Sequence, residues 1–156
     1  MAFQPRDPSF QTRVRASFAR QQAMRTLGVT LRRVAPGEVD LALPFSADLT
    51  QQHGFLHAGI VTAVVDSACG YAALTLMEPA AAVLTVEFKV QLLAPARGHW
   101  FLGLGRVIRA GRTLTVVSGE FRALAHEPHG ETPAGELLAL MTGTMMAVRD
   151  RPDLAD

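Results

Sequence analysis

The run HGFLHAGIVTAVVDSACGYAALTLM, residues 53–77, decides the fold of this 156-residue chain. From residue 57 onward it has no polar side apart from Asp66 and small hydroxyl residues. A helix of this composition is surrounded by protein on most sides, so we expect residues 57–77 to form the central helix. The Asp66 carboxylate then needs an explanation, because burying an unpaired charge is strongly unfavourable.

The same run is nearly long enough to cross a bilayer. Asp66 at its centre would cost roughly 2.5 to 3.5 kcal/mol on insertion, and the surrounding Ala, Gly, Ser and Thr return little of that energy. We therefore predict a buried helix and no membrane partner. The first residues carry Asp7 and several arginines where a secretory signal needs an apolar core. With Cys69 as the single cysteine, the expected location is cytoplasmic.

Length and composition narrow the classes of function. The length fits one domain spanning residues 1–156. The net charge is +1 and 19% of residues are charged, so no broad positive field exists to attract nucleic acid. His53 and His57 are four residues apart, but Gly54 disfavours a helix through them and no third ligand is near. We expect no nucleic-acid partner, no metal and no cofactor.

Helical and strand patterns flank the central run. Residues 8–27 predict a first helix that Asp7 caps and Gly28 ends, with Phe10, Val14, Phe18 and Met24 on its apolar side. Its arginines, Arg13, Arg15 and Arg20, are expected to face solvent. Residues 29–45 read as a hairpin around the turn APGE. Further strands are expected at 84–92, 98–109, 112–125 and 136–148, with a polar loop at 126–135.

The order of these elements predicts an α+β domain whose curved antiparallel sheet wraps the central helix. In residues 84–92 apolar and polar side chains alternate, which indicates a strand with one buried face. The 136–148 segment is apolar on both faces, as in a central strand or one that meets a partner. Such a sheet has an edge and an outer face to cover, so a homodimer is the expected minimum.

One motif resembles a known family. The segment QQHGFLHAG, residues 51–59, with a carboxylate nine residues after His57, is similar to the hotdog-fold acyl-CoA thioesterases of the phenylacetate-degradation, PaaI-like type. The later segments VEFKVQLLAPARG and GRVIRAGRTL extend the resemblance over about residues 30–148. Two positions depart from the pattern: Gln51 stands where asparagine is usual, and Ala58 replaces the first glycine of His-Gly-Gly, Gly59 being the second.

The resemblance implies a hotdog fold and the hydrolysis of aryl- or medium-chain acyl-CoA, with the CoA thioester as substrate and no cofactor. It assigns the Ala58 backbone amide to the thioester carbonyl, and it implies that carboxylate and amide come from different subunits of a homodimer, itself paired into a dimer of dimers. Spacing agrees, because nine residues separate His57 from Asp66 by over 13 Å at about 1.5 Å per residue of helix. Asp66 is then a general base, or less favourably a nucleophile.

Other residues are carried over or placed by helical spacing. The resemblance gives Thr85 a role in positioning water, and Gln51, Gly54, His57 and Gly59 belong to its motif. Helical spacing predicts that the wall beside Asp66 is built from Thr62, Ala63, Cys69 and Gly70. Arginines suit the phosphates of CoA, and the candidates are Arg97, Arg106, Arg109 and Arg112.

Less specific interpretations stay open beside these. Asp66 could be a buried structural carboxylate, His57 could orient the loop before the helix, and Cys69 could be a small core residue. The arginines could be solvated strand ends. At the level of function, the departures at Gln51 and Ala58 leave room for a non-catalytic acyl-CoA binder. A dehydratase of the same fold would want a histidine base, which a carboxylate after His57 does not offer.

Overall fold

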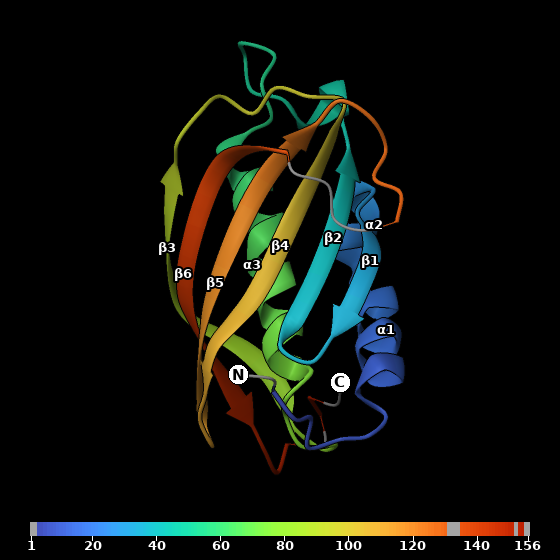
Figure 1. Ribbon diagram of the computed structural model, residues 1–156, viewed down its shortest axis with the longest axis vertical. Helices are drawn as coiled ribbons and strands as arrows, with labels where there is room; N and C mark the ends of the chain where they lie inside the picture. Colours follow the sequence, from blue (N-terminus) through green and yellow to red (C-terminus); the bar gives the residue numbers. More distant parts are fainter. Residues whose placement is uncertain (1–2, 131–134, 152, 155–156) are drawn as a thin grey trace.

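The computed structural model describes residues 3–130, 135–151 and 153–154, and in them one antiparallel sheet curves around one long helix (Figure 1). The strand order is β1-β2-β4-β5-β6-β3. The strands are β1 Thr30–Ala35, β2 Glu38–Pro44, β3 Ala82–Leu92, β4 Trp100–Ala110, β5 Leu114–Leu124 and β6 Glu136–Val148. This is the predicted α+β hotdog architecture, with β6 lying inside the sheet as its two apolar faces indicated.

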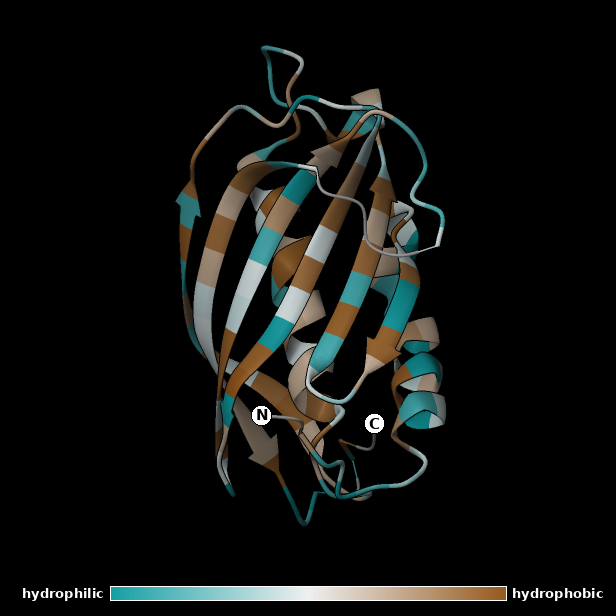
Figure 2. Ribbon diagram, viewed as in Figure 1, coloured by the Kyte–Doolittle hydropathy of each residue, from teal (hydrophilic) through white to brown (hydrophobic). Residues whose placement is uncertain are grey.

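The central helix, α3, runs from Ala58 to Leu74 and packs against the inner face of the sheet (Figure 1). It ends three residues before the predicted limit. His57 is its N-cap, and the helix contacts every strand from β2 to β6. Its apolar composition follows from this position, since the curved sheet lies against one side of it along its length (Figure 2).

Glycines in the sheet let α3 approach its backbone. A Cβ on Gly105 would lie 2.2 Å from the carbonyl oxygen of Ala68, and one on Gly119 would lie 2.3 Å from a methyl of Val65. Neither position can accept a larger residue without moving the helix away from the sheet. This explains by close packing the glycines within β4 and β5, which match no phosphate-binding loop.

The N-terminal helix differs from its prediction. It is two helices, α1 Phe10–Arg20 and α2 Gln22–Leu27, because Gln21 adopts an extended conformation between them. Gly28, with φ of 76°, ends α2 as expected. The prediction that Arg13 faces solvent is wrong: its side chain is buried and donates to the carbonyls of Leu74, Met77 and Glu78, just past α3.

Strand β3 forms one edge of the sheet, and the prediction that one of its faces is buried fails for a single copy of the chain. Its apolar side chains are largely exposed: Leu84 46%, Val86 53%, Phe88 44% and Leu92 55%. The reason is that, among the described residues, no strand or helix lies beyond β3 to cover these side chains. An edge with this composition is a surface that another copy can pair with.

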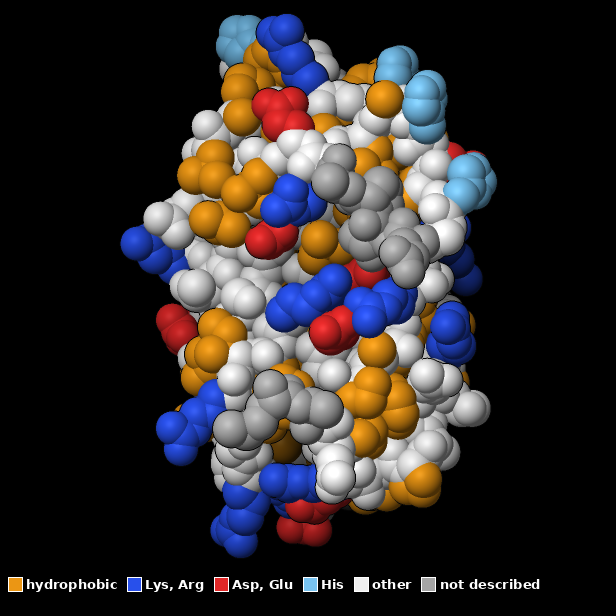
Figure 3. All heavy atoms as spheres, in the orientation of Figure 1, with side chains coloured by type: hydrophobic (Ala, Val, Ile, Leu, Met, Phe, Trp, Pro, Cys, Tyr) orange, Lys and Arg blue, Asp and Glu red, His pale blue; other side chains and the backbone are white. Residues whose placement is uncertain are grey.

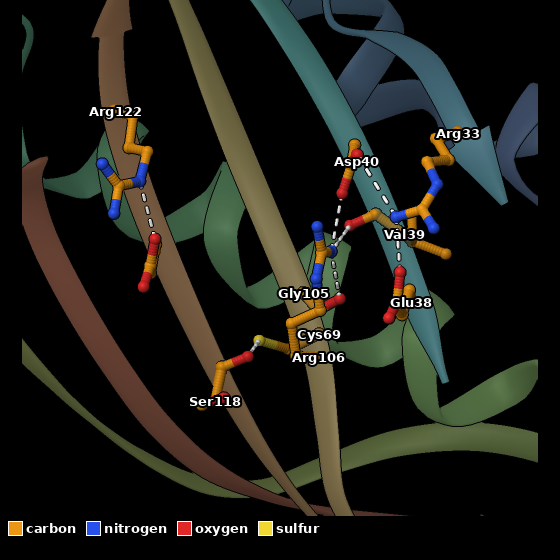
Figure 4. Close-up of polar contacts among 10 residues, drawn as sticks. Arg33, Glu38, Val39, Asp40, Cys69, Gly105, Arg106, Ser118 and Arg122 are labelled. Atoms are coloured by element: carbon orange, nitrogen blue, oxygen red, sulfur yellow. Dashed lines mark hydrogen bonds and ion pairs between the residues drawn. The ribbon is translucent and has the colours of Figure 1, made fainter. Parts of the chain in front are cut away.

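The outer face of the sheet, turned away from α3, carries paired charges (Figure 3). Asp40 on β2 is almost fully buried, and Arg106 on β4 approaches its carboxylate at 2.6 Å (Figure 4). Arg33 also lies 4.0 Å from Asp40 and pairs with Glu38. Of the predicted polar loop at 126–135, residues 131–134 lie outside the described residues.

Candidate active site

Asp66 lies on the face of α3 that the sheet leaves open, and it lines a cavity of about 340 Å³. We call this the Asp66 cavity. Thr85 on β3 and Gly70 on α3 line it as well, so the structure brings together three of the predicted site residues. The cavity reaches α1 on its far side.

Thr85 donates a hydrogen bond from its hydroxyl to Oδ1 of Asp66 at 2.9 Å. Burial raises the pKa of the Asp66 carboxyl, and the Thr85 hydrogen bond partly opposes that rise because it stabilises the charged form. A raised pKa makes a carboxylate a better proton acceptor near neutral pH. The site therefore holds a carboxylate suited to general-base chemistry.

The N-terminus of α3 lines a second cavity, of about 460 Å³, which contains Ala58 and Gln51. We call this the Ala58 cavity. Of the first amide groups of the helix, Gly59 donates to Nδ1 of His57 at 2.9 Å, and Ile60 and Val61 both donate to the His57 carbonyl oxygen. Within the described residues, the Ala58 N–H donates to nothing.

His57 therefore has a structural role at the start of α3. Its ring caps the helix by accepting from Gly59, and a Cβ at that position would lie 3.0 Å from Nδ1, so glycine suits it. This bond directs the ring proton to Nε2 and leaves Ala58 as the free amide of the helix end. The structural interpretation of His57 is the one that its contacts support.

The loop before α3 explains two more motif residues. Gly54 has φ of 81° in a tight turn in which its N–H donates to the Gln51 carbonyl oxygen at 3.0 Å. The side-chain Oε1 of Gln51 accepts from the His53 N–H. Gly54 thus shapes the loop, and Gln51 borders the Ala58 cavity with its acceptor already engaged.

Ala58 and Asp66 are separated within one chain. Eight residues of helix place them about 12 Å apart along the axis, and they line different cavities. The two groups cannot act on one carbonyl from the same α3.

Comparison with known proteins assigns the family. Residues 53–127 match the model of the Thioesterase superfamily. A thioesterase family protein from Silicibacter pomeroyi is 50% identical, with a TM-score of 0.83 over 90% of this chain and 98% of that one. The chain belongs to the thioesterase superfamily.

More distant solved structures share the fold of this thioesterase. The PaaI protein from the phenylacetic acid degradation operon of E. coli is 16% identical, with a TM-score of 0.78 over 90% of this chain and 94% of its own. A thioesterase from Haemophilus influenzae is 17% identical, with a TM-score of 0.75 over 96% of both chains. These structures confirm the predicted hotdog fold. Given the family match, the chain is a thioester hydrolase.

The four candidate arginines of the thioesterase are spread over its surface. Arg97 is exposed and lies 4.4 Å above the ring of Phe55, which lines the Ala58 cavity. Arg106 pairs with Asp40 on the outer face of the sheet, and it also donates to the carbonyls of Val39 and Gly105 (Figure 4). Arg109 and Arg112 are exposed near the β4–β5 turn. Only Arg97 adjoins either cavity of α3.

Three residues expected beside Asp66 do not line its cavity, namely Thr62, Ala63 and Cys69. Cys69 is buried against the sheet, where its thiol contacts the Ser118 carbonyl oxygen at 3.4 Å (Figure 4), and burial raises its pKa to about 12. It is a core residue and does not line the cavity. Thr62 donates to the Ala58 carbonyl oxygen and lines neither cavity. The α3 residues that line the cavity together with Asp66 are Ser67, Gly70 and Tyr71.

The contribution of α1 and of the residue after it to this cavity was not predicted from the sequence. Ser17, Arg20 and Gln21 line the Asp66 cavity opposite β3. A signal existed: Ser17 and Gln21 interrupt the apolar stripe of this helix at helical spacing. Among the described residues, no helix is long and apolar enough to span a membrane, and no cluster of three His, Cys, Asp or Glu side chains could hold a metal ion.

Proposed function

We propose that this thioesterase hydrolyses aryl- or medium-chain acyl-CoA to the free acid and CoA, in a site shared by the two subunits of a homodimer. The unpaired Ala58 N–H, at the positive end of α3 and beside a cavity, is the observation that supports the proposal most directly. It is a donor held ready for the oxygen of a thioester carbonyl.

The reaction needs a base as well as a donor. Asp66 of one subunit removes a proton from water while the water oxygen attacks the carbonyl carbon, and the Ala58 N–H of the other subunit stabilises the negative oxygen that forms. Collapse of this intermediate breaks the carbon–sulfur bond. The proton held by Asp66 passes to the departing CoA thiolate, which restores the carboxylate. Attack by Asp66 itself is the less favoured second route.

The exposed edge strand β3 supports the proposed dimer. Pairing of two β3 edges would extend the sheet through both copies and cover the exposed apolar side chains of β3. It would also bring two α3 helices side by side, so that the Asp66 cavity of one lies near the helix end of the other. A dimer of dimers would then use the outer faces of the sheets.

Two substitutions test the chemistry. Asp66→Asn removes the base with little change of shape, and turnover of acyl-CoA is expected to be lost. Ala58→Pro replaces the N–H with a ring carbon while keeping the backbone path, because proline suits the first residue of a helix and His57 already has the extended conformation that precedes proline. A loss of roughly 10²–10³ in kcat is expected for one oxyanion donor.

Both variants are compared with the parent by steady-state hydrolysis of a panel of acyl-CoA esters. Circular dichroism and size-exclusion chromatography check the fold and the assembly. Turnover by Asp66→Asn at the parent rate would remove Asp66 from the mechanism. Binding of acyl-CoA without hydrolysis of any panel member by the parent would instead select a non-catalytic binding protein.

A further inference from the structure

Helix α1 forms one wall of the Asp66 cavity, and this wall is polar. It supplies Ser17 and Arg20, and Gln21 follows directly after it; Ser67 and Tyr71 of α3 continue the polar lining. The region matched by the family model begins at residue 53, so α1 lies outside it.

Hydrogen bonds between the α1 side and the α3 side hold the polar groups of this wall in place. Gln21 donates from Nε2 to the Ser67 hydroxyl at 3.4 Å, and Ser17 donates to the Tyr71 hydroxyl at 3.5 Å. Arg13 fixes α1 to the end of α3 through three carbonyl oxygens. The wall is therefore a fixed surface of the cavity.

One atom of the wall lacks a partner. Oε1 of Gln21 is buried and accepts no hydrogen bond from the described residues. An alkyl chain in this cavity would leave that acceptor unpaired and would cover the neighbouring hydroxyl groups without offering them a bond. Covering polar groups without replacing their hydrogen bonds is unfavourable, so the cavity disfavours a purely apolar occupant.

The two cavities differ in what they can hold. The Ala58 cavity is lined mainly by apolar residues, and Arg97, stacked on Phe55 at its border, offers a cation to the phosphates of CoA. With the thioester carbonyl between the Ala58 N–H and the partner's Asp66, CoA runs along the Ala58 cavity. The acyl group then enters the Asp66 cavity.

On the basis of the proposed function, we infer that α1 selects acyl groups whose far end carries a hydrogen-bonding oxygen. Gln21, Ser17 and Tyr71 suit a hydroxyl, which can donate to Oε1 of Gln21 and accept from a neighbouring hydroxyl. Arg20 suits a carboxylate. Both end groups offer an oxygen that can form hydrogen bonds with the wall. Recognition of the hydroxyl depends on Gln21, and recognition of the carboxylate depends on Arg20.

The test compares hexanoyl-CoA with its analogues that end in a hydroxyl or a carboxyl group. The parent enzyme is expected to have at least about tenfold higher kcat/KM for one of the oxygen-ended esters, because a site built for a hydrogen bond rejects the analogue that lacks it. Gln21→Met should reduce a preference for the hydroxyl about tenfold. Arg20→Met should reduce a preference for the carboxyl by a similar factor.

Arg15→Met is the matched control, because Arg15 lies on the same helix, is exposed and does not line the cavity. It should keep the parent's preference. Ser17→Ala, a smaller change, repeats the test if Gln21→Met loses the fold by circular dichroism. Equal or faster hydrolysis of hexanoyl-CoA by the parent, or an unchanged preference in the lining variants, would overturn the inference.

Failure of the inference can be told apart from failure of the proposed function. If Asp66→Asn abolishes hydrolysis of all three esters while the end groups make no difference, only the role of α1 is wrong. If Asp66→Asn hydrolyses them at the parent rate, the proposed function itself fails.

Discussion

Two opposing influences act on the Asp66 carboxyl. Burial raises its pKa above the ordinary value of 3.8, and the hydrogen bond from Thr85 lowers it. In the proposed mechanism Asp66 must be ionised to accept a proton from water, so kcat/KM should fall as the pH drops through this raised pKa. The acid limb of the pH profile is therefore expected above the range in which an exposed aspartate titrates.

Thr85→Val is predicted to move that limb to higher pH. Valine keeps the branched shape but removes the hydroxyl, and a carboxylate that loses a donor becomes harder to ionise, so its pKa rises. The measurement is kcat/KM between about pH 5 and 9, with the position of the acid limb as the readout. A limb that stays in place, or moves to lower pH, would show that Thr85 does not set the pKa of the base.

At the scale of elements, one contact joins α1 to the end of the central helix α3. Arg13 donates to the carbonyls of Leu74, Met77 and Glu78, at and just after the end of α3, and its Nε lies 3.4 Å from Oδ2 of Asp7. Asp7 is itself buried, and the Ser9 hydroxyl, then the Ser9 N–H and Arg13, hold its pKa below the ordinary value. Arg13 thus replaces water at a buried helix end.

Arg13→Ala is predicted to destabilise the protein by about 3 kcal/mol, because it leaves three carbonyl oxygens and a buried carboxylate without their cation. Urea unfolding at neutral pH measures the change. Arg15→Ala, on the exposed side of the same helix, should stay within about 0.5 kcal/mol of the parent. Similar losses for the two variants would mean that the buried contact contributes no more than an exposed arginine.

At the scale of the whole molecule, the proposed site can be divided between two chains. In a dimer of one Asp66→Asn subunit and one Ala58→Pro subunit, one site loses both groups and the other keeps both. Random reassociation makes half of the dimers mixed, and each mixed dimer has one intact site of two. Two inactive variants should therefore recover about a quarter of the parent activity when they are unfolded and refolded together.

Activity of the mixture is compared with that of each variant treated in the same way. If both groups belonged to one subunit, every site in the mixture would lack one of them and no activity would return. Restored hydrolysis therefore reports directly on the sharing of the site, independently of the oligomeric state measured by chromatography.

The motif residues were predictable to different degrees. Spacing along one helix was enough to separate Ala58 from Asp66, since the rise per residue is constant. Thr85 was placed only through the family resemblance, because its contact with Asp66 joins two elements 19 residues apart. Cys69 was placed wrongly, because i+3 spacing puts a residue near Asp66 but does not say which side of the helix meets the sheet.

The amino-acid pattern alone was sufficient for the central helix, the hairpin and the four later strands, because their periods of burial are local properties of the chain. It was not sufficient for the break at Gln21, the burial of Arg13, the exposure of β3 or the polar wall that α1 adds to the Asp66 cavity. These depend on contacts between segments far apart in sequence. Whether a charged or polar side chain is solvated, paired or facing a cavity is decided only when those segments meet.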